Sequence, residues 1–176
     1  MIHYRNLRAE EICRPLFRDF IRRQPVTACW RRERGRWVIR DDPFIDDWTE
    51  ADYNALLAGL RRTAAAGGLV RAAFAGGALK GFASVEPELF GGGQAYLDLS
   101  NLHVSADMRR QGIGAALFSA AAQWARAQGA AKLYISAHSA VETQAFYRKL
   151  GCGEAQAYNQ AHVLAEPYDC QLEYRL

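Results

Sequence analysis

A strand, a glycine-containing turn, a long helix and a second strand follow one another directly over residues 95–137. The strands are expected over AYLDLSNLHV (95–104) and KLYISA (132–137), and the helix over IGAALFSAAAQWARAQG (113–129). The turn RRQGIG (109–114) brings free backbone N–H groups to the positive end of that helix. An anion such as a phosphate can bind there, because glycine lets it approach the backbone without meeting a Cβ.

The rest of the chain adds strands and helices in a mixed order. Further strands are expected at 2–7, in a hairpin at 27–42, in a pair at 69–88 that turns at Gly76-Gly77, and at 171–176. Further helices are expected at 9–23, where Pro15 introduces a kink, at 50–66 and at 141–151. An antiparallel meander followed by strand–helix–strand–helix indicates one α/β domain over residues 1–176.

Composition excludes several classes of protein. The chain has 176 residues, 50% of them hydrophobic, which suits one domain with a full core. A net charge of +3 is too small to indicate nucleic-acid binding. The charged start MIHYRNLRAEE is unlike a signal peptide and no apolar run approaches the ~18 residues of a membrane span, so we expect a cytoplasmic protein without membrane contact. The four cysteines lack CxxC or CxxH spacing, so we expect reduced thiols and no metal site.

Two well-known phosphate motifs do not fit the glycine turn. A P-loop requires GxxxxGK[ST], but Ala116 and Leu117 stand where the lysine and serine would be useful. A dinucleotide fingerprint requires a third glycine, whereas position 117 is leucine. From these residues alone, the turn is either a phosphate cradle or a strand-to-helix turn that needs glycine for its geometry.

Two motifs in the right order and separation resemble the GNAT N-acetyltransferase superfamily. A strand that ends in Val104 is followed by Arg109-xx-Gly112-x-Gly114, which is similar to the family's [QR]xxGxG/A. Later, FYRKLG (146–151) is similar to the family's FYxKLGF, with cysteine in place of the final phenylalanine.

The resemblance covers about residues 95–153, and the strand pair 69–88 fits the family's preceding strands. Segment 24–48 has no counterpart that can be aligned. The resemblance implies a mixed, mostly antiparallel central sheet flanked by helices, in which strands 97–104 and 132–137 splay apart at the cofactor site. It also implies acetyl-CoA as the cosubstrate.

The resemblance assigns the cofactor contacts to the glycine turn, the strand before it and the later helix. The backbone of the turn would hold the pyrophosphate, Leu102 and Val104 would pair with the pantetheine arm, and the Leu102 amide would donate to the thioester carbonyl. The implied cofactor-binding residues are Leu102, His103, Val104, Arg109, Arg110, Gln111, Gly112, Ile113, Gly114, Ala115, Ser139, Phe146 and Tyr147. For Ser139, capping of the following helix is an equal alternative.

Three residues are candidates for proton transfer. Tyr147 matches the family's usual general acid, whose phenol protonates the leaving thiolate; the alternative is a core tyrosine packed beside Phe146. Asp98 and Glu86 are candidate bases, and a structural carboxylate is the alternative for Asp98.

Strand alternation adds an expectation about faces. It places Asp98 on one face of its strand with Ser100, Leu102 and Val104. The side chain of His103 is then expected on the opposite face.

The resemblance implies transfer of an acetyl group from acetyl-CoA to a primary amine of a small molecule or peptide, by direct attack in a ternary complex. A non-catalytic acyl-CoA-binding or sensing module is the alternative. Tryptophans and aspartates between Trp30 and Tyr53 would suit a cationic acceptor, or the hairpin at 27–42 could form a homodimer interface. The sequence does not identify the acceptor amine.

Overall fold

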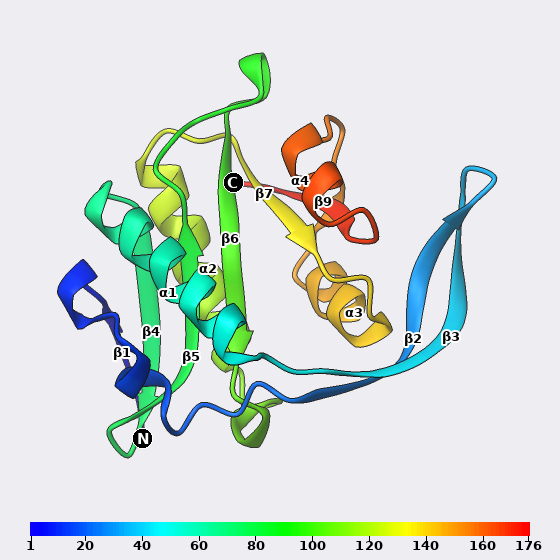
Figure 1. The fold of residues 1–176 in the computed structure, drawn as a ribbon. Helices are drawn as coiled ribbons and strands as arrows, with labels where there is room; N and C mark the ends of the chain where they lie inside the picture. The colour runs from blue at the N-terminus through cyan, green and yellow to red at the C-terminus, as the bar shows by residue number, and fades with distance from the viewer.

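The computed structural model describes the backbone of residues 1–176 and the side chain of every residue except Gln94. A seven-stranded sheet in the order β1-β4-β5-β6-β7-β9-β8 forms its centre, and a separate two-stranded ribbon, β2-β3, projects from it (Figure 1). β6 and β7 run parallel, and the other neighbouring pairs of the sheet are antiparallel. The expected mixed, mostly antiparallel α/β fold is therefore confirmed.

The element bounds are as follows. The strands are β1 (Ile2–Asn6), β2 (Gln24–Glu33), β3 (Arg36–Asp46), β4 (Leu69–Ala75), β5 (Ala78–Val85), β6 (Tyr96–Val104), β7 (Lys132–Ala137), β8 (Gly153–Glu154) and β9 (Cys170–Arg175). The helices are α1 (Glu50–Ala65), α2 (Ile113–Ala127), α3 (Val141–Lys149) and α4 (Gln160–Ala165), with short 3-10 helices η1 (Ala9–Glu11), η2 (Arg14–Phe17), η3 (Gly92–Gln94) and η4 (Ala106–Met108). Among the described residues, none of the helices combines the length and apolar character that crossing a bilayer requires.

Helices cover both faces of the sheet. α2 and α3 pack on one face, where Leu117, Phe118 and Tyr147 join apolar side chains of the strands in one core. α1 and the η1–η2 segment pack on the opposite face around a second core that contains Phe17 and Leu60. α4 lies on the same face as α1 (Figure 1). The two faces of the central strands therefore meet different chemical surroundings.

The expected single helix at 9–23 is wrong. The structure has two short 3-10 helices there, η1 and η2, with Ile12 and Cys13 extended between them. Pro15 lies at the start of η2, because it lacks the N–H that a continuous helix would need and because the residue before a proline disfavours helical geometry.

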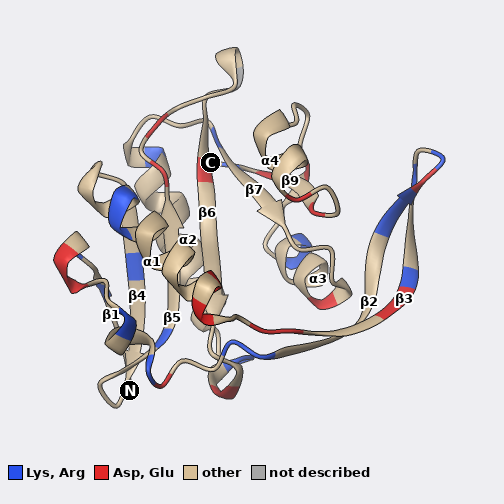
Figure 2. Cartoon of the chain, in the orientation of Figure 1, with Lys and Arg blue, Asp and Glu red and all other residues tan. Residues whose placement is uncertain are grey.

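The β2–β3 ribbon is the expected hairpin, extended to residues 24–46. Arg34 and Gly35 form its turn with positive φ angles of 48° and 78°, as a two-residue hairpin turn requires. The N–H of Trp30 donates to the carbonyl of Ser139 over 2.8 Å, and the Arg31 guanidinium donates to the Ser139 hydroxyl over 2.7 Å. These bonds attach the ribbon to the body, while its far end carries a concentration of basic residues (Figure 2).

β6 contains a β-bulge next to β5. Ser84 pairs with Asn101, but the next residue of β5, Val85, pairs with Leu99, so Ser100 is an additional residue in β6. The Ser100 hydroxyl donates to Glu86 over 2.6 Å and lies 2.8 Å from the Ser84 hydroxyl. The bulge shifts the alternation of side chains for the rest of the strand.

Gly81 on β5 sets how closely α2 approaches the sheet. A Cβ at this position would lie 2.9 Å from Cγ2 of Ile113 and 3.0 Å from Cδ1 of Leu117. We predict that Gly81→Ala destabilises the fold by about 1–3 kcal/mol, because it overpacks the buried first turns of α2.

The matched control is Gly59→Ala in α1, where the nearest atom to the new Cβ is Nη2 of Arg62 at 3.8 Å. This change should stabilise the protein by about 0.5–1 kcal/mol, because alanine favours a helix interior. Urea unfolding measures both variants. Equal effects of the two substitutions would contradict the account of Gly81.

Candidate active site

A cleft of about 930 Å³ opens where β6, β7, α3 and the start of α2 meet. Most of the residues that the resemblance assigns to the cofactor line it. These are Leu102, His103, Val104, Arg109, Arg110, Gly112, Ile113, Gly114, Ala115, Phe146 and Tyr147. The sequence therefore predicts the location of this cleft, although the segments that form it are distant along the chain.

The cleft exists because β6 and β7 part. Their pairing runs from Tyr96 opposite Lys132 to Asp98 opposite Tyr134, and both strands continue beyond that pair. β6 stays paired with β5, and β7 stays paired with β9. The backbone groups that face the gap lack a strand partner, so they are free to bind an extended ligand.

The two glycines of the turn have different physical roles. Gly112 begins α2 in the left-handed conformation, with φ of 81°, and a Cβ there would meet none of the described atoms within 4 Å. It therefore supplies the turn's conformation and leaves the space before the helix open. Gly114 supplies close packing, because a Cβ there would lie 3.2 Å from the ring of Phe146.

The two arginines of the turn also differ. Nε of Arg109 donates to the carbonyl of Val104 over 3.3 Å, and its Nη2 donates to the carbonyl of Arg23 over 3.5 Å. Arg110 is exposed beside the first turn of α2 and has a positive φ of 62°. Arg109 thus stabilises the turn through hydrogen bonds, while Arg110 adds exposed positive charge near the N-terminus of α2.

Tyr147 is buried on α3 between aromatic rings and lines the cleft. Its ring centroid lies 5.1 Å from that of Phe146 and 6.3 Å from that of Phe118. Burial raises the pKa of the phenol well above its ordinary value. The hydroxyl is therefore protonated at neutral pH, and the ring packs in the core.

The expected alternation along β6 is wrong beyond Ser100. Leu102 and Val104 pack on the α2 face, but Asp98, which was expected to share their face, lies on the opposite face, where it contacts α4. His103 shares that face with Asp98 instead of opposing it, since its ring packs beside α1-side aromatics. The bulge at Ser100 is the physical reason, because one additional residue reverses the faces that follow it.

The imidazole of His103 packs on the α1 face of the sheet. Its ring centroid lies 4.8 Å from Trp48 and 5.3 Å from Phe82. Desolvation, with the positive charges of Arg22 and Arg109, lowers the pKa of His103 to about 3. The imidazole is therefore neutral at physiological pH.

Three other predicted residues lie outside the cleft lining. The Ser139 hydroxyl accepts from Arg31, and the expectation that Ser139 caps α3 is wrong, because the N-cap is Ala140. Gln111 is exposed and its side-chain amide donates to the sulfur of Met108. Glu86 accepts from Ser100 and, over 2.8 Å, from Thr63, which places it in a structural network on the sheet.

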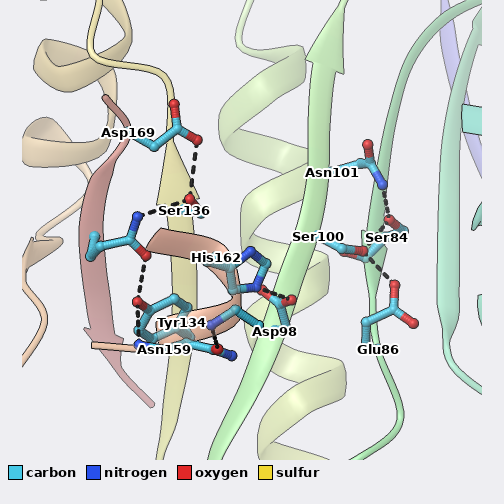
Figure 3. Close-up of polar contacts among 12 residues, drawn as sticks. Ser84, Glu86, Asp98, Ser100, Asn101, Tyr134, Ser136, Asn159, His162 and Asp169 are labelled. Atoms are coloured by element: carbon cyan, nitrogen blue, oxygen red, sulfur yellow. Dashed lines mark hydrogen bonds and ion pairs between the residues drawn. The ribbon is translucent and has the colours of Figure 1, made fainter. Parts of the chain in front are cut away.

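A second cavity of about 140 Å³ lies under α4, on the other side of the point where β6 and β7 part. Leu99, Ser100 and Ser136 line both cavities, so the two adjoin. Asp98 lines the second cavity together with His162, Glu166 and Asp169. Figure 3 shows Asp98, His162 and Asp169 among the polar residues of this region.

His162 is the residue that sequence reasoning missed. Its Nε2 lies 2.7 Å from Oδ2 of Asp98, and this hydrogen bond raises the pKa of the imidazole above its ordinary value. His162 sits in α4, for which no element was expected. The signal was present: Asn159 accepts from the N–H of Ala161 as an N-cap, and helix-forming residues follow it.

Comparison with models of protein families gives a match to the acetyltransferase (GNAT) family over residues 28–152, which is more than half of the sequence. The chain belongs to the GNAT acetyltransferase family. Comparison with the curated proteins gave no match.

Several solved GNAT structures share the fold over their whole length. A nourseothricin acetyltransferase superposes with a TM-score of 0.70 at 15% identity, covering 99% of this chain and 98% of that one. A Bacillus anthracis protein assigned as a streptothricin acetyltransferase, in complex with acetyl coenzyme A, gives 0.73 at 15% identity, covering 100% and 99%. The Thermoplasma acidophilum PaiA N-acetyltransferase, in complex with coenzyme A, gives 0.63 at 14% identity, covering 100% and 99%. At these identities the likeness establishes the GNAT fold.

The surroundings of the two site histidines predict different titrations. The imidazole of His103 should stay neutral throughout the neutral range, whereas that of His162 should titrate above its ordinary value. Asp98→Asn should lower the pKa of His162, because it removes the carboxylate that stabilises the imidazolium. NMR titration of the imidazole protons measures both values. An unchanged pKa of His162 in Asp98→Asn would contradict the described pair.

Proposed function

We propose that this GNAT protein transfers the acetyl group of acetyl-CoA to a primary amine of a small molecule, by direct attack in a ternary complex. The observation that carries the proposal is the cleft between β6 and β7, which begins at the glycine turn of α2 and passes Tyr147. The family match supports acyl transfer as the class of chemistry.

The cleft fits an extended acyl-CoA. The N–H groups at the start of α2, with Gly112 leaving space in front of them and Arg110 nearby, form an anion site for the diphosphate. The unpaired edge of β6 would accompany the pantetheine arm, and the backbone N–H of Leu102 is our choice for the donor to the thioester carbonyl. When bound, acetyl-CoA would supply an activated acetyl thioester. Two of the similar GNAT structures hold acetyl-CoA or CoA.

Tyr147 is our choice for the proton donor to the leaving thiolate. It lines the cleft, is buried, and keeps its proton at neutral pH because its pKa is raised. A general acid must carry its proton at the operating pH, and Tyr147 meets this requirement.

The acceptor side supports a cationic small molecule. Glu142 lines the cleft, as does Asp46, which is ion-paired with Arg22, and further carboxylates lie in the adjoining cavity under α4. Carboxylates with aromatic neighbours attract protonated amines. Among the similar structures are a nourseothricin acetyltransferase and an aminoglycoside acetyltransferase. Antibiotics with amino groups are therefore the acceptors that we would test first.

A thiol-release assay tests the proposed function. Purified protein and acetyl-CoA are mixed in turn with nourseothricin, an aminoglycoside, spermidine and a lysine-containing peptide, and a thiol-reactive dye records CoA release. We expect release with at least one small-molecule amine and acetylation of that amine by mass spectrometry. Tight acetyl-CoA binding by calorimetry without release for any amine would instead favour a non-catalytic acyl-CoA-binding or sensing module.

Gly112→Glu should abolish acetyl-CoA binding, because a carboxylate would occupy the diphosphate site. The control is Gly129→Glu, which places the same side chain at the other end of α2 on a glycine with nearly the same φ, 84° against 81°. Both variants carry similar backbone strain, so only a specific loss in Gly112→Glu reports on the anion site. Calorimetry with acetyl-CoA measures both, and unchanged affinity in Gly112→Glu would overturn the assignment.

Tyr147→Phe should lower kcat by about 100-fold or more and leave acetyl-CoA affinity nearly unchanged, because it removes a proton donor and keeps the buried ring. Tyr4→Phe on β1 is the control, since Tyr4 lies outside the cleft lining. Steady-state kinetics with the fastest amine of the panel gives kcat. Normal turnover in Tyr147→Phe would remove the phenol from the mechanism.

A further inference from the structure

The cavity under α4 meets the cleft at one place, the end of the β6–β7 pairing. Leu99, Ser100 and Ser136 line both spaces, and Asp98 is the last β6 residue paired to β7. An amine held in this cavity would therefore lie on one side of the strand gap, with an acyl-CoA on the other side. Attack on the thioester would then pass through that gap.

The Asp98–His162 pair is fixed in a defined orientation in this cavity. Oδ2 of Asp98 lies 2.7 Å from Nε2 of His162, and the imidazole stacks on the ring of Tyr134 with centroids 5.7 Å apart and an interplanar angle of 19°. Since Nε2 is directed to Asp98, Nδ1 is the ring nitrogen that remains available to take up a proton. Figure 3 shows the imidazole between α4 and β6, pointing toward Asp98.

One polar atom at the pair remains without a partner. Oδ1 of Asp98 is buried and accepts no hydrogen bond from any described residue. Burying a carboxylate oxygen without a hydrogen bond costs free energy, unless a donor group of a ligand or a water molecule bonds to it.

Three carboxyl groups line the cavity with His162: Asp98 on β6 bonds to it, Asp169 precedes β9, and Glu166 follows α4. The uncharged phenol ring of Tyr134 on β7 stacks on the imidazole. Asp169 accepts from the hydroxyl of Ser136 over 3.1 Å, and burial raises its pKa. Three carboxyl groups around one imidazole favour a cationic occupant over a neutral or anionic one.

We propose that the cavity under α4 binds the protonated primary amine of the acceptor, and that His162 receives the proton the amine must lose before it attacks. Asp98 is the positioning residue: it holds Nε2 and so leaves Nδ1 directed to the substrate. The acceptor class is an alkylammonium group small enough for a cavity of about 140 Å³, carried on a molecule that extends into the cleft. This inference rests on the proposed acetyl transfer.

The chemistry balances. The ammonium gives one proton to His162, the resulting amine forms a C–N bond to the thioester carbonyl, and the C–S bond breaks. Tyr147 gives its proton to the leaving thiolate, which becomes the CoA thiol. The amine nitrogen loses a second proton as the amide forms, and that proton restores the Tyr147 phenol. One proton passes from His162 to solvent in each turnover, and no oxidant or reductant takes part.

The pH dependence of kcat/KM tests the inference, with whichever amine of the panel turns over fastest. The variants are His162→Gln and Asp98→Asn, with His3→Gln as the control because His3 is an exposed residue on β1. Calorimetry with acetyl-CoA and thermal unfolding establish that each variant is folded.

We expect wild-type kcat/KM to rise with pH through the pKa of His162, since the imidazole must be neutral to accept a proton. His162→Gln should lose that titration and about 100-fold in rate at its plateau, which is the usual range for a general base. In Asp98→Asn the titration should move to lower pH, because the carboxylate raises the pKa of His162. A purely structural pair would lower the rate or the stability without moving this titration.

The outcomes separate the inference from the proposed function. An active wild-type protein whose His162→Gln variant keeps both the plateau rate and the titration overturns the role of His162 and leaves acetyl transfer intact. A wild-type protein that releases no thiol with any amine overturns both. Three results together support the inference. His162→Gln loses rate, the titration of kcat/KM in Asp98→Asn moves to lower pH, and His3→Gln keeps the wild-type rate and titration.

Discussion

β6 and β7 are hydrogen-bonded to each other at only three residue pairs, from Tyr96 with Lys132 to Asp98 with Tyr134, and the site is built around that short contact. Beyond it each strand keeps a partner on its outer side, so the sheet can open in the middle while its strands stay formed. The backbone groups that face the gap have no strand to satisfy them. A ligand with its own amides and carbonyls can take the place of the missing partner.

The bulge in β6 also shapes the site, because it directs the side chains on its two sides to different faces of the sheet. Leu102 and Val104 point to the α2 side, where the glycine turn and Tyr147 lie. Asp98 points to the α4 side, where it holds His162. In the proposed mechanism, the leaving group and its proton donor are therefore on one face of the sheet, and the acceptor and its base are on the other. Neither group needs to pass through the core.

Local signals were enough to predict much of this arrangement. The periodicity of residues 113–129 predicts α2, the Gly76-Gly77 pair predicts the β4–β5 turn, and the motifs around Gly112 and Tyr147 locate the cleft. Each of these features depends on residues that are adjacent in the sequence, where helix propensity and turn chemistry determine the local structure. Pro15 was expected only to kink a helix at 9–23, but its effect is larger: the helix is split at this proline.

The features that the sequence did not predict depend on contacts between distant residues. The bulge in β6 places Ser100 against Ser84 and Glu86 of the neighbouring chain segment, and no pattern within β6 alone requires it. His162 lies 64 residues from Asp98, in a helix of six residues that is too short to give a clear period. Strand alternation then assigned Asp98 and His103 to opposite faces, because that rule assumes an unbulged strand.

A crystal structure of the complex with CoA tests the central claim that one gap joins two sites. We expect the diphosphate at the N–H groups that follow Gly112, the pantetheine arm between β6 and β7, and the sulfur at the boundary near Ser100, within reach of the Tyr147 hydroxyl and open to the cavity under α4. A sulfur directed away from that cavity, or β6 and β7 paired beyond Asp98 with CoA bound elsewhere, would contradict the account.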